Sequence, residues 1–394
     1  MRLITRGLLF AVLCSALVGT TFVPVDSQTA TPIEIPAILS TTGYLAFVGK
    51  GEARSLQVLE GVINKSGGIN GRPVKFNILD GQSSPQIGLQ IANDLIAKKV
   101  PAFIGPDTTA GCKAVAPIVE KSGPVMYCLS PGIAPAQGSY VFSAQVNTHA
   151  LLVDVMRFFK AHGWNRVALL TTTDANGQDI TQGYGNTLAL PEFATMQSVA
   201  LEHFAGGDLT VDAQMSRIKA AAPQALIAWA AGTPFGTVAH GFHDSGMNVP
   251  VLTIAINANP AQLKEYGAFL PAPLYFPSNE GTVLGDTPPG AARTAQNLFF
   301  GAYKAAGFTP EAIDAIPWDA GMLLAGAYRK AGPNSTSTQI RDWILAQNNW
   351  GGVFGDYNFT DGSQRGIGDR NALIFVWDPA KNAMVAVSKA GGFR

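Results

Sequence analysis

Short apolar runs alternate with longer amphipathic stretches along most of this 394-residue chain. The apolar run over 33–39 predicts a buried strand, and apolar residues recurring every three or four positions over 52–65 predict a helix. The glycine-containing stretch 43–51 is interpreted as the loop between them. Further strands are predicted over 74–79, 100–104, 125–129, 166–171, 196–204, 225–230, 251–256, 354–359 and 373–378. Further helices are predicted over 85–99, 110–121, 151–162, 180–190, 210–221, 237–245, 291–306 and 318–331.

This alternation predicts an α/β protein with parallel sheets covered by helices on both faces, because parallel strands need a crossover connection that is usually a helix. The pattern starts again near residue 150, so the chain contains two similar α/β units in tandem. The predicted fold class is therefore α/β, with two doubly wound parallel-sheet lobes.

The first 30 residues have the layout of a secretory signal peptide. Arg2 and Arg6 precede an apolar segment over 8–18, which is too short to span a bilayer, and small polar residues follow. Cys14 follows Leu13, where lipid-attachment motifs prefer a small residue, so it is interpreted as part of the apolar segment. We expect residues 1–30 to be removed and the protein to be exported to the periplasm.

Composition and charge narrow the choice of partner. Hydrophobic residues make up 47% of the chain and charged residues 14%, which is typical of a globular protein with large buried sheets. The 27 Lys and Arg residues balance 27 Asp and Glu residues, and no basic run occurs. Neither a nucleic acid nor a membrane surface is therefore favoured, which leaves a small solute or another protein.

Two cysteines, Cys112 and Cys128, follow the predicted signal peptide. An even pair in an exported protein permits one disulfide. Free cysteines also pack as small apolar side chains in protein cores. The sequence leaves both alternatives open.

Candidate ligand contacts lie in the loops that join each strand to the following helix. These loops gather at the carboxyl ends of parallel strands, where helix N-termini present free amide groups. Their hydroxyl and amide side chains cap helices and can also hydrogen-bond a small carboxylate. Thr109 and Ser130 are the leading candidates for the second role. The other candidates in these loops are Thr42, Gln82, Thr108, Gly132, Asn176, Thr233 and Asn257.

Catalytic and metal-binding patterns are largely missing. Neither Gly-x-Ser-x-Gly nor His-Glu-x-x-His occurs, and no Gly-x-Gly-x-x-Gly follows the first strand. His240 and His243 lie three apart on a predicted helix without an evident third ligand, so they are interpreted as part of a solvated face. Asp107 and Asp174 are candidates for an acid–base pair but also fit helix caps or loop contacts. We expect no catalytic activity, no cofactor and no metal.

Several short segments occur in an order typical of one family. They are GGINGRP over 67–73, IGP over 104–106, SP at 130–131, GWNRVA over 163–168 and HDSG over 243–246. With these segments in this order and spacing, the chain from residue 33 onward resembles the type I periplasmic binding proteins, specifically the leucine/isoleucine/valine-binding family.

The resemblance implies two lobes joined by three crossovers, with a ligand clamped between them. The first lobe is expected to comprise 31–146 and 276–355, and the second 147–275 and 356–394, with hinge strands near 145–147. It also implies a membrane ABC permease that recognises the closed, loaded protein, and a monomeric binding subunit. A ligand sensor that meets a signalling receptor is an alternative, and an exported enzyme on the same fold is another.

The resemblance also bears on the ligand. Amino-acid binders of the family place hydroxyls near Thr109 and Ala134 to hold the α-carboxylate, and Ala134 offers only its backbone amide. They place an acid near 255–257 for the ammonium, and this stretch has no carboxylate. A buried ammonium without a counter-charge costs on the order of several kcal/mol. A carboxylate with an apolar or aromatic body, such as a benzoate- or cinnamate-type acid, is therefore expected, with a branched-chain amino acid or an amide as the alternative. Candidate ring contacts are Phe47, Trp229, Phe235 and Trp318.

Overall fold

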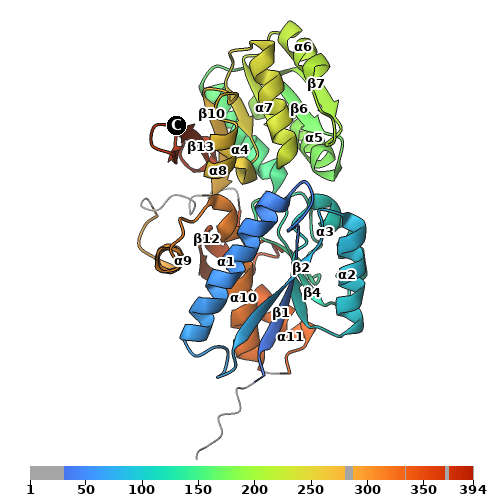
Figure 1. Cartoon of the computed structure of the whole chain (residues 1–394), viewed down its shortest axis with the longest axis vertical. Helices are drawn as coiled ribbons and strands as arrows, with labels where there is room; N and C mark the ends of the chain where they lie inside the picture. The colour runs from blue at the N-terminus through green and yellow to red at the C-terminus, as the bar shows by residue number, and fades with distance from the viewer. Residues whose placement is uncertain (1–30, 280–286, 333, 369–371, 394) are drawn as a thin grey trace, which may run out of the picture.

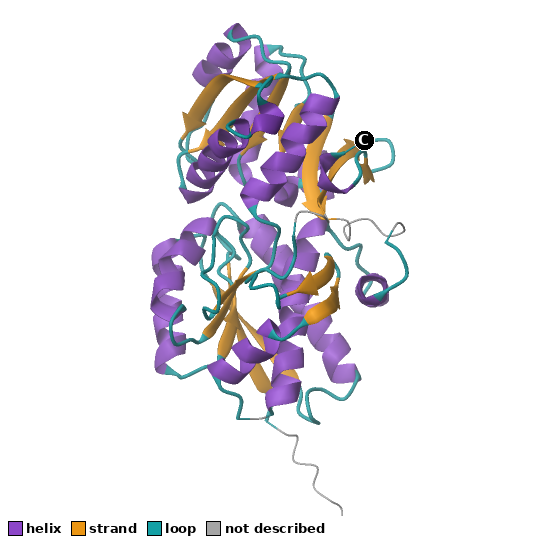
Figure 2. Cartoon of the chain, turned by 180° about the vertical axis from the view of Figure 1, so that it is seen from behind, coloured by secondary structure: helices purple, strands orange, loops and turns teal. Residues whose placement is uncertain are grey.

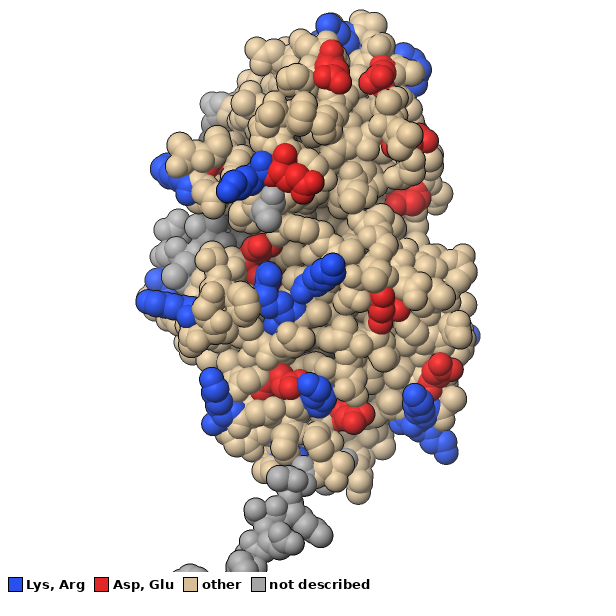
Figure 3. Space-filling model, viewed as in Figure 1, with Lys and Arg blue, Asp and Glu red and all other residues tan. Residues whose placement is uncertain are grey.

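The computed structural model describes residues 31–279, 287–332, 334–368 and 372–393, which form two α/β lobes stacked along the long axis of the molecule (Figure 1). The predicted signal peptide over 1–30, with Cys14, lies outside the described residues. Across these ranges, no helix has both the length and the apolar character needed to cross a membrane. Acidic and basic side chains are interspersed over the face shown in Figure 3, which agrees with the balanced charge of the sequence.

The first lobe is built on a parallel five-stranded sheet of order β2-β1-β3-β4-β5. Helices α1 and α10 cover one face through Leu56 and Trp318, and α2 and α3 cover the other through Leu95 and Val115. The strands are β1 (Ile33–Leu39), β2 (Val74–Asp80), β3 (Ala102–Ile104), β4 (Val125–Cys128) and β5 (Val141–Ser143). The helices are α1 (Ala46–Lys65), α2 (Pro85–Ala97), α3 (Thr109–Val119), α9 (Ala291–Ala305), α10 (Ala315–Ala331) and α11 (Ser337–Leu345), with the 3-10 turn η4 (Ala312–Asp314). The hairpin of β11 (Asn348–Gly352) and β12 (Gly355–Asn358) completes this lobe (Figure 2).

The second lobe holds a seven-stranded sheet of order β14-β13-β10-β9-β8-β6-β7. Five strands pair in parallel, whereas β13 from the C-terminal segment pairs antiparallel with both β10 and β14. The strands are β6 (Arg166–Thr172), β7 (Gln197–Phe204), β8 (Ala225–Trp229), β9 (Val251–Thr253), β10 (Leu274–Asn279), β13 (Ala372–Asp378) and β14 (Ala383–Ala386). The helices are α4 (Thr148–Ala161), α5 (Ala175–Leu188), α6 (Asp212–Ala220), α7 (Thr233–Ser245) and α8 (Pro260–Glu265), with the 3-10 turns η1 (Pro191–Phe193), η2 (Ala255–Asn257) and η6 (Ala390–Gly392). The predicted α/β class with helices on both faces of parallel sheets is confirmed.

Two of the lobe boundaries lie at other positions in the structure than the sequence predicts. Strand β10 pairs with β9 and β13 as far as Asn279, so the boundary expected at 275/276 falls inside a strand of the second sheet. Strand β12 pairs with β11, and Phe359 and Ile367 pack into the core of the first lobe. The boundary expected at 355/356 therefore falls inside that hairpin. Strand pairing and core packing assign 276–279 to the second lobe and extend the first lobe to Ile367.

The predicted loop over 43–51 is also wrong in part, because α1 begins at Ala46. Gly49 lies within this helix, at a point where it passes against the backbone that follows β1. A Cβ on Gly49 would lie 2.2 Å from the carbonyl oxygen of Ser40. This glycine therefore permits close packing of helix on loop, and it does not mark a loop of its own.

Candidate ligand-binding site

A small cavity lies between the two lobes. It is formed by the loops that follow β1, β3 and β4 in the first lobe and β6, β8 and β9 in the second. These loops meet at the carboxyl ends of parallel strands in both sheets, where α/β proteins commonly bind small molecules. The lining residues are Tyr44, Leu45, Val48, Glu52, Asp107, Thr108, Thr109, Leu129, Ser130, Pro131, Gln145, Asp174, Asn176, Ala231, Ile254, Ile256 and Ile316.

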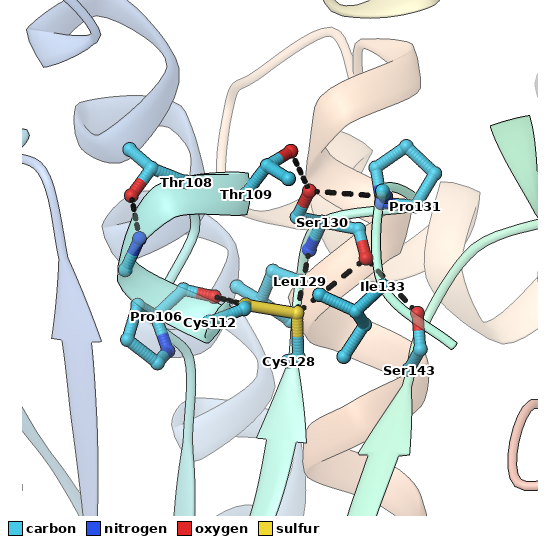
Figure 4. Close-up of a disulfide and its surroundings, with 12 residues drawn as sticks. Pro106, Thr108, Thr109, Cys112, Cys128, Leu129, Ser130, Pro131, Ile133 and Ser143 are labelled. Carbon is cyan, nitrogen blue, oxygen red and sulfur yellow. Dashed lines mark hydrogen bonds between the residues drawn. A yellow bond between two sulfur atoms is a disulfide. The ribbon is translucent and has the colours of Figure 1, made fainter. Parts of the chain in front are cut away.

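Three hydroxyl-bearing residues line this cavity: Thr108 and Thr109 at the N-terminus of α3, and Ser130 in the loop after β4. Thr109 is the first residue of α3, and its Oγ1 lies 2.6 Å from Oγ of Ser130 (Figure 4). Thr108 caps the helix, since its Oγ1 accepts a hydrogen bond from the backbone N–H of Gly111 at 3.0 Å. The structure thus brings together Thr108, Thr109 and Ser130 beside the positive end of a helix dipole.

A disulfide lies directly behind these hydroxyls. It joins Cys112, in the first turn of α3, to Cys128, the last residue of β4 (Figure 4). The backbone N–H of Ser130 also lies 3.3 Å from Sγ of Cys128. The crosslink therefore ties the helix that carries Thr109 to the strand that leads to Ser130.

Arg365 supports the same loop from the C-terminal segment of the first lobe. Its buried guanidinium donates hydrogen bonds to the carbonyl oxygens of Pro131 at 2.9 Å and Gln145 at 2.7 Å, and also to that of Ile133. Burial lowers the pKa of Arg365 to about 10. This side chain holds the loop after β4 next to the first passage between the lobes, and its role was not predicted from the sequence.

A buried carboxyl group, Glu52, and a half-buried one, Asp107, lie together in the wall of the cavity. Asp107 accepts hydrogen bonds from the backbone N–H of Ser40 at 2.6 Å and from its hydroxyl at 2.7 Å. Glu52 and Asp107 lie close enough for each carboxyl group to shift the pKa of the other. Burial raises the pKa of Asp107 to about 6. Burial and the negative charges of Asp107 and Asp314 raise the pKa of Glu52 well above its usual range.

The second lobe contributes Asp174 and Asn176 to the opposite wall. Asp174 caps α5, because its Oδ1 accepts hydrogen bonds from Thr172 Oγ1 at 2.8 Å and from the N–H of Gly177 at 2.9 Å. Asn176 accepts a hydrogen bond from the indole of Trp229 at 3.4 Å, while its buried Nδ2 has no partner among the described residues. Asp107 and Asp174 thus lie in opposite lobes and hold loops, as the cap interpretation predicts.

Tyr44 reaches between these two walls. Burial raises the pKa of its phenol, and the negative charges of Asp174 and Asp107 raise it further. Its carbonyl oxygen lies 3.5 Å from the backbone N–H of Thr233 in the second lobe. A second contact between the lobes joins the amide of Asn259 to the carboxylate of Glu311. Thr233 therefore lies at a contact between the lobes and does not line the cavity.

Several aromatic and amide candidates lie in the cores instead. Trp318 packs against Phe299 at a ring-centroid distance of 5.1 Å in the core of the first lobe, and Phe235 is buried in the core of the second. Trp229 is also fully buried. Asn257 is buried, and its amide bonds to Gly232, Ala230 and Thr253. The sequence could not separate cavity from core, because both positions favour the same apolar and amide side chains.

The remaining candidates lie around the cavity without lining it. Thr42 donates its hydroxyl to Asp80 at 2.7 Å, and Gln82 lies in the same surface turn with a φ of 54°. Phe47 is 37% exposed on the first turn of α1. A Cβ on Gly132 would lie 2.8 Å from Oγ1 of Thr109, so only glycine fits there, and Ala134 follows two residues later.

The two histidines have other contacts. His243 Nδ1 lies 3.0 Å from Asp244 at the surface, and the ring of His240 packs on Phe269 at 3.8 Å. Over the part of the chain that the structure describes, no group of three or more potential metal ligands occurs.

Sequence reasoning missed most of the apolar lining and also Glu52. The apolar residues not predicted are Leu45, Val48, Ile254, Ile256 and Ile316. Glu52 carried a usable signal, because it lies four positions before Leu56 and so falls on the apolar face of the predicted helix. A carboxyl on such a face is rarely buried without a partner or a task.

Two α/β lobes with a cavity at the facing carboxyl ends of their strands define a two-lobed binding protein. A model of the periplasmic binding protein family matches residues 32–382, so the chain belongs to this family. A Leu/Ile/Val-binding protein homolog from Brucella melitensis biotype 1 is 22% identical over 225 residues, which cover 56% of this chain and 60% of that protein.

Solved structures show the same fold. An extracellular ligand-binding receptor from Rhodopseudomonas palustris HaA2 superimposes with a TM-score of 0.79 at 21% identity, covering 90% of this chain and 99% of that chain. The isoleucine complex of LivJ from Streptococcus pneumoniae has a TM-score of 0.73 at 19% identity, covering 90% and 99%. The benzoate complex of a solute-binding protein from R. palustris has a TM-score of 0.74 at 16% identity, covering 91% and 96%. These identities show a shared fold, and the ligands belong to those proteins.

Proposed function

We propose that this protein is the extracytoplasmic solute-binding subunit of an ABC importer, and that it closes its two lobes on a small organic solute. The observation that carries the proposal is the cavity between the lobes, lined from both sides by strand-to-helix loops. A ligand that contacts both walls stabilises the closed form through its greater affinity for that form. The family membership of residues 32–382 supports the same function.

The ligand is proposed to carry a carboxylate that lies at the N-terminus of α3. The hydroxyls of Thr109 and Ser130 and the free amides of the first helical turn can donate hydrogen bonds to it. The bound ligands of two structural neighbours, isoleucine and benzoate, both carry this group. Leu45, Val48, Ile254, Ile256 and Ile316 supply apolar surface for the rest of the solute.

The proposed body of the solute is apolar, with aromatic acids and branched-chain amino acids as its two candidate classes. Among the described lining residues, Tyr44 is the one aromatic side chain. Support for a benzoate- or cinnamate-type acid therefore comes from the benzoate-bound neighbour more than from ring contacts in this cavity.

The proposed setting follows from the same function. The protein acts in the periplasm after removal of residues 1–30, binds as a monomer without catalysing a reaction, and delivers its solute to a membrane permease that recognises the closed form. A role as a ligand sensor for a signalling receptor is the alternative. Capture of permease subunits, as opposed to a receptor, by the loaded protein would distinguish the two.

A thermal-shift screen tests the binding function. Benzoate, cinnamate, aliphatic acids, leucine, valine and simple amides would be added separately to the purified protein. A ligand present at about 100 times its Kd stabilises the folded state by about 2.7 kcal/mol and raises the Tm. A rise with at least one class is expected, and no rise with any compound would contradict the proposal.

A further inference from the structure

We infer that the Glu52–Asp107 pair in the first lobe is a subsite for a cation, and that the solute carries a protonated amine or a similar positively charged group. This inference rests on the proposed function, because it assumes that the cavity between the lobes holds a solute. The inference adds a positively charged group to the proposed solute and assigns a binding site to that group. A benzoate- or cinnamate-type acid carries no such group.

The first observation is an unpaired carboxyl oxygen in the cavity wall. Glu52 lies on the first turns of α1 and is 1% exposed, yet its Oε2 has no hydrogen-bond partner among the described residues. The residue lines the cavity next to Asp107. A buried polar atom without a partner costs free energy, so such atoms usually pair with a water, an ion or a ligand.

The second observation is the sign of the charged groups around the cavity. Apart from the phenol of Tyr44, the ionisable side chains in its described lining are the carboxyl groups of Glu52, Asp107 and Asp174, and no Lys, Arg or His is among them. A solute that carries only a carboxylate would add a further negative charge to this wall. An ammonium group would offset the charge already present, and its N–H groups would find acceptors there.

Neighbouring charges outside the lining do not reverse this balance. From η4, Asp314 adds negative charge near Glu52, and Arg54 is engaged by Asp314 at 3.1 Å and by Glu311 at 4.0 Å. Arg365 points its guanidinium at carbonyl oxygens behind the loop after β4. Across the cavity, Asp174 and the phenol of Tyr44 face the pair.

Glu52 is protonated when the cavity contains no cation, because burial and the negative charges of Asp107 and Asp314 raise its pKa well above the usual range. Burial also raises the pKa of Asp107, to about 6, so that Asp107 is mostly ionised at pH 7. An incoming ammonium favours ionised carboxylates, so Glu52 releases its proton to solvent as the cation binds.

This subsite also supplies the counter-charge for an ammonium group that the second lobe lacks. The second lobe has no carboxylate near 255–257, and the sequence therefore predicted no partner for an ammonium. The pair in the first lobe can supply that partner from α1 and from the loop after β3. The hydroxyls at α3 remain free to bind a carboxylate on the same solute.

The test uses two series of matched compounds that share one body. On the aliphatic body, isoamylamine carries only an amine, 4-methylpentanoate only a carboxylate, and leucine both. On the aromatic body, 2-phenylethylamine, hydrocinnamate and phenylalanine form the corresponding series. Titration calorimetry in buffers of different ionisation enthalpy measures affinity and proton release together. We expect an amine-bearing member of a series to bind more tightly than its carboxylate-only analogue and to release protons at pH 7.

The pH dependence and one variant provide further readouts. Protonation of Asp107 below its pKa of about 6 removes one negative charge, and Glu52 must also lose its proton, so the Kd of the amine should be at least tenfold weaker at pH 5 than at pH 8. Glu52→Gln should weaken amine binding at least tenfold, abolish the proton release and leave carboxylate-only binding unchanged or tighter. Glu60→Gln is the matched control, because Glu60 lies on the same helix and bonds Lys75 and Phe76 away from the cavity. An unchanged Tm for Glu52→Gln would show that the variant is folded.

Each outcome decides one of the two proposals. Binding of carboxylate-only compounds in preference to every amine, or amine binding that Glu52→Gln leaves intact, would overturn the cation subsite while the binding function stands. The absence of binding by all six compounds and by the whole thermal-shift screen would overturn the binding function, and the subsite with it.

Discussion

The two walls of the cavity differ in chemistry and in how they are held. The first lobe presents the hydroxyls of Thr109 and Ser130, which a disulfide and Arg365 hold in place, and the carboxyl groups of Glu52 and Asp107. The second lobe presents Ala231, Ile254 and Ile256, with Asp174 and Asn176 at its rim. The first lobe therefore supplies the hydroxyl groups for a polar end of the solute, whereas apolar side chains of both lobes cover its body.

The largest expected effect comes from removing the crosslink behind the polar wall. A disulfide across 16 residues contributes about 3 kcal/mol, so Cys112→Ala combined with Cys128→Ala should lower the free energy of unfolding by about that amount. Urea unfolding followed by circular dichroism measures the loss. Ligand affinity should fall as well, because the crosslink holds the loops of Thr109 and Ser130. Unaltered affinity in the folded double variant would mean that Arg365 and packing position the hydroxyls alone.

A smaller effect is expected from one hydroxyl of the polar wall. Thr109→Ala should weaken ligand binding by about 1–3 kcal/mol, because a hydrogen bond to a charged group is lost. Thr109→Ser is the matched control, since it keeps the hydroxyl and removes a methyl group. Titration calorimetry of both variants separates the two contributions. Equal affinities for the alanine and serine variants would show that the hydroxyl of Thr109 does not bind the ligand.

The smallest effect is expected in the apolar wall. Ile256→Val removes one methylene from a half-buried side chain that lines the cavity, which should weaken binding by about 1 kcal/mol or less. The same titration gives the comparison with Thr109→Ala. A larger loss for the isoleucine substitution than for the threonine substitution would reverse the assignment of roles to the two walls.

The sequence predicted the fold well because hydrophobic periodicity and short buried strands are local signals. Strand β1 begins and ends where predicted, and α2, α4 and α9 differ from prediction by at most three residues at either end. Strands β5, β10, β11 and β14 were missed, as were helices α8 and α11. Three residues are too few to show a pattern in β5, and Pro277 interrupts the pattern in β10.

The site was harder to predict, because its residues come together through packing between distant segments. Thr108, Thr109 and Ser130 were found from their place after a strand, a property that the sequence contains. Glu52 and Ile316 lie on helices far apart in the sequence, and their positions in the cavity depend on how α1 and α10 cover the first sheet. Local patterns do not report this packing.

Because the chain returns to the first lobe after forming most of the second, part of the first lobe's core is synthesised late. The core that covers β1 and β4 includes Trp318 and Leu324 of α10, which are made 175 and 181 residues after Ser143 (318 − 143 and 324 − 143), where the last strand of the first sheet ends. A nascent chain that ends before α10 therefore leaves one apolar face of the first sheet uncovered. The second sheet is completed later still, because β13 and β14 are made after α10, so neither lobe can finish folding before the C-terminal part of the chain is synthesised.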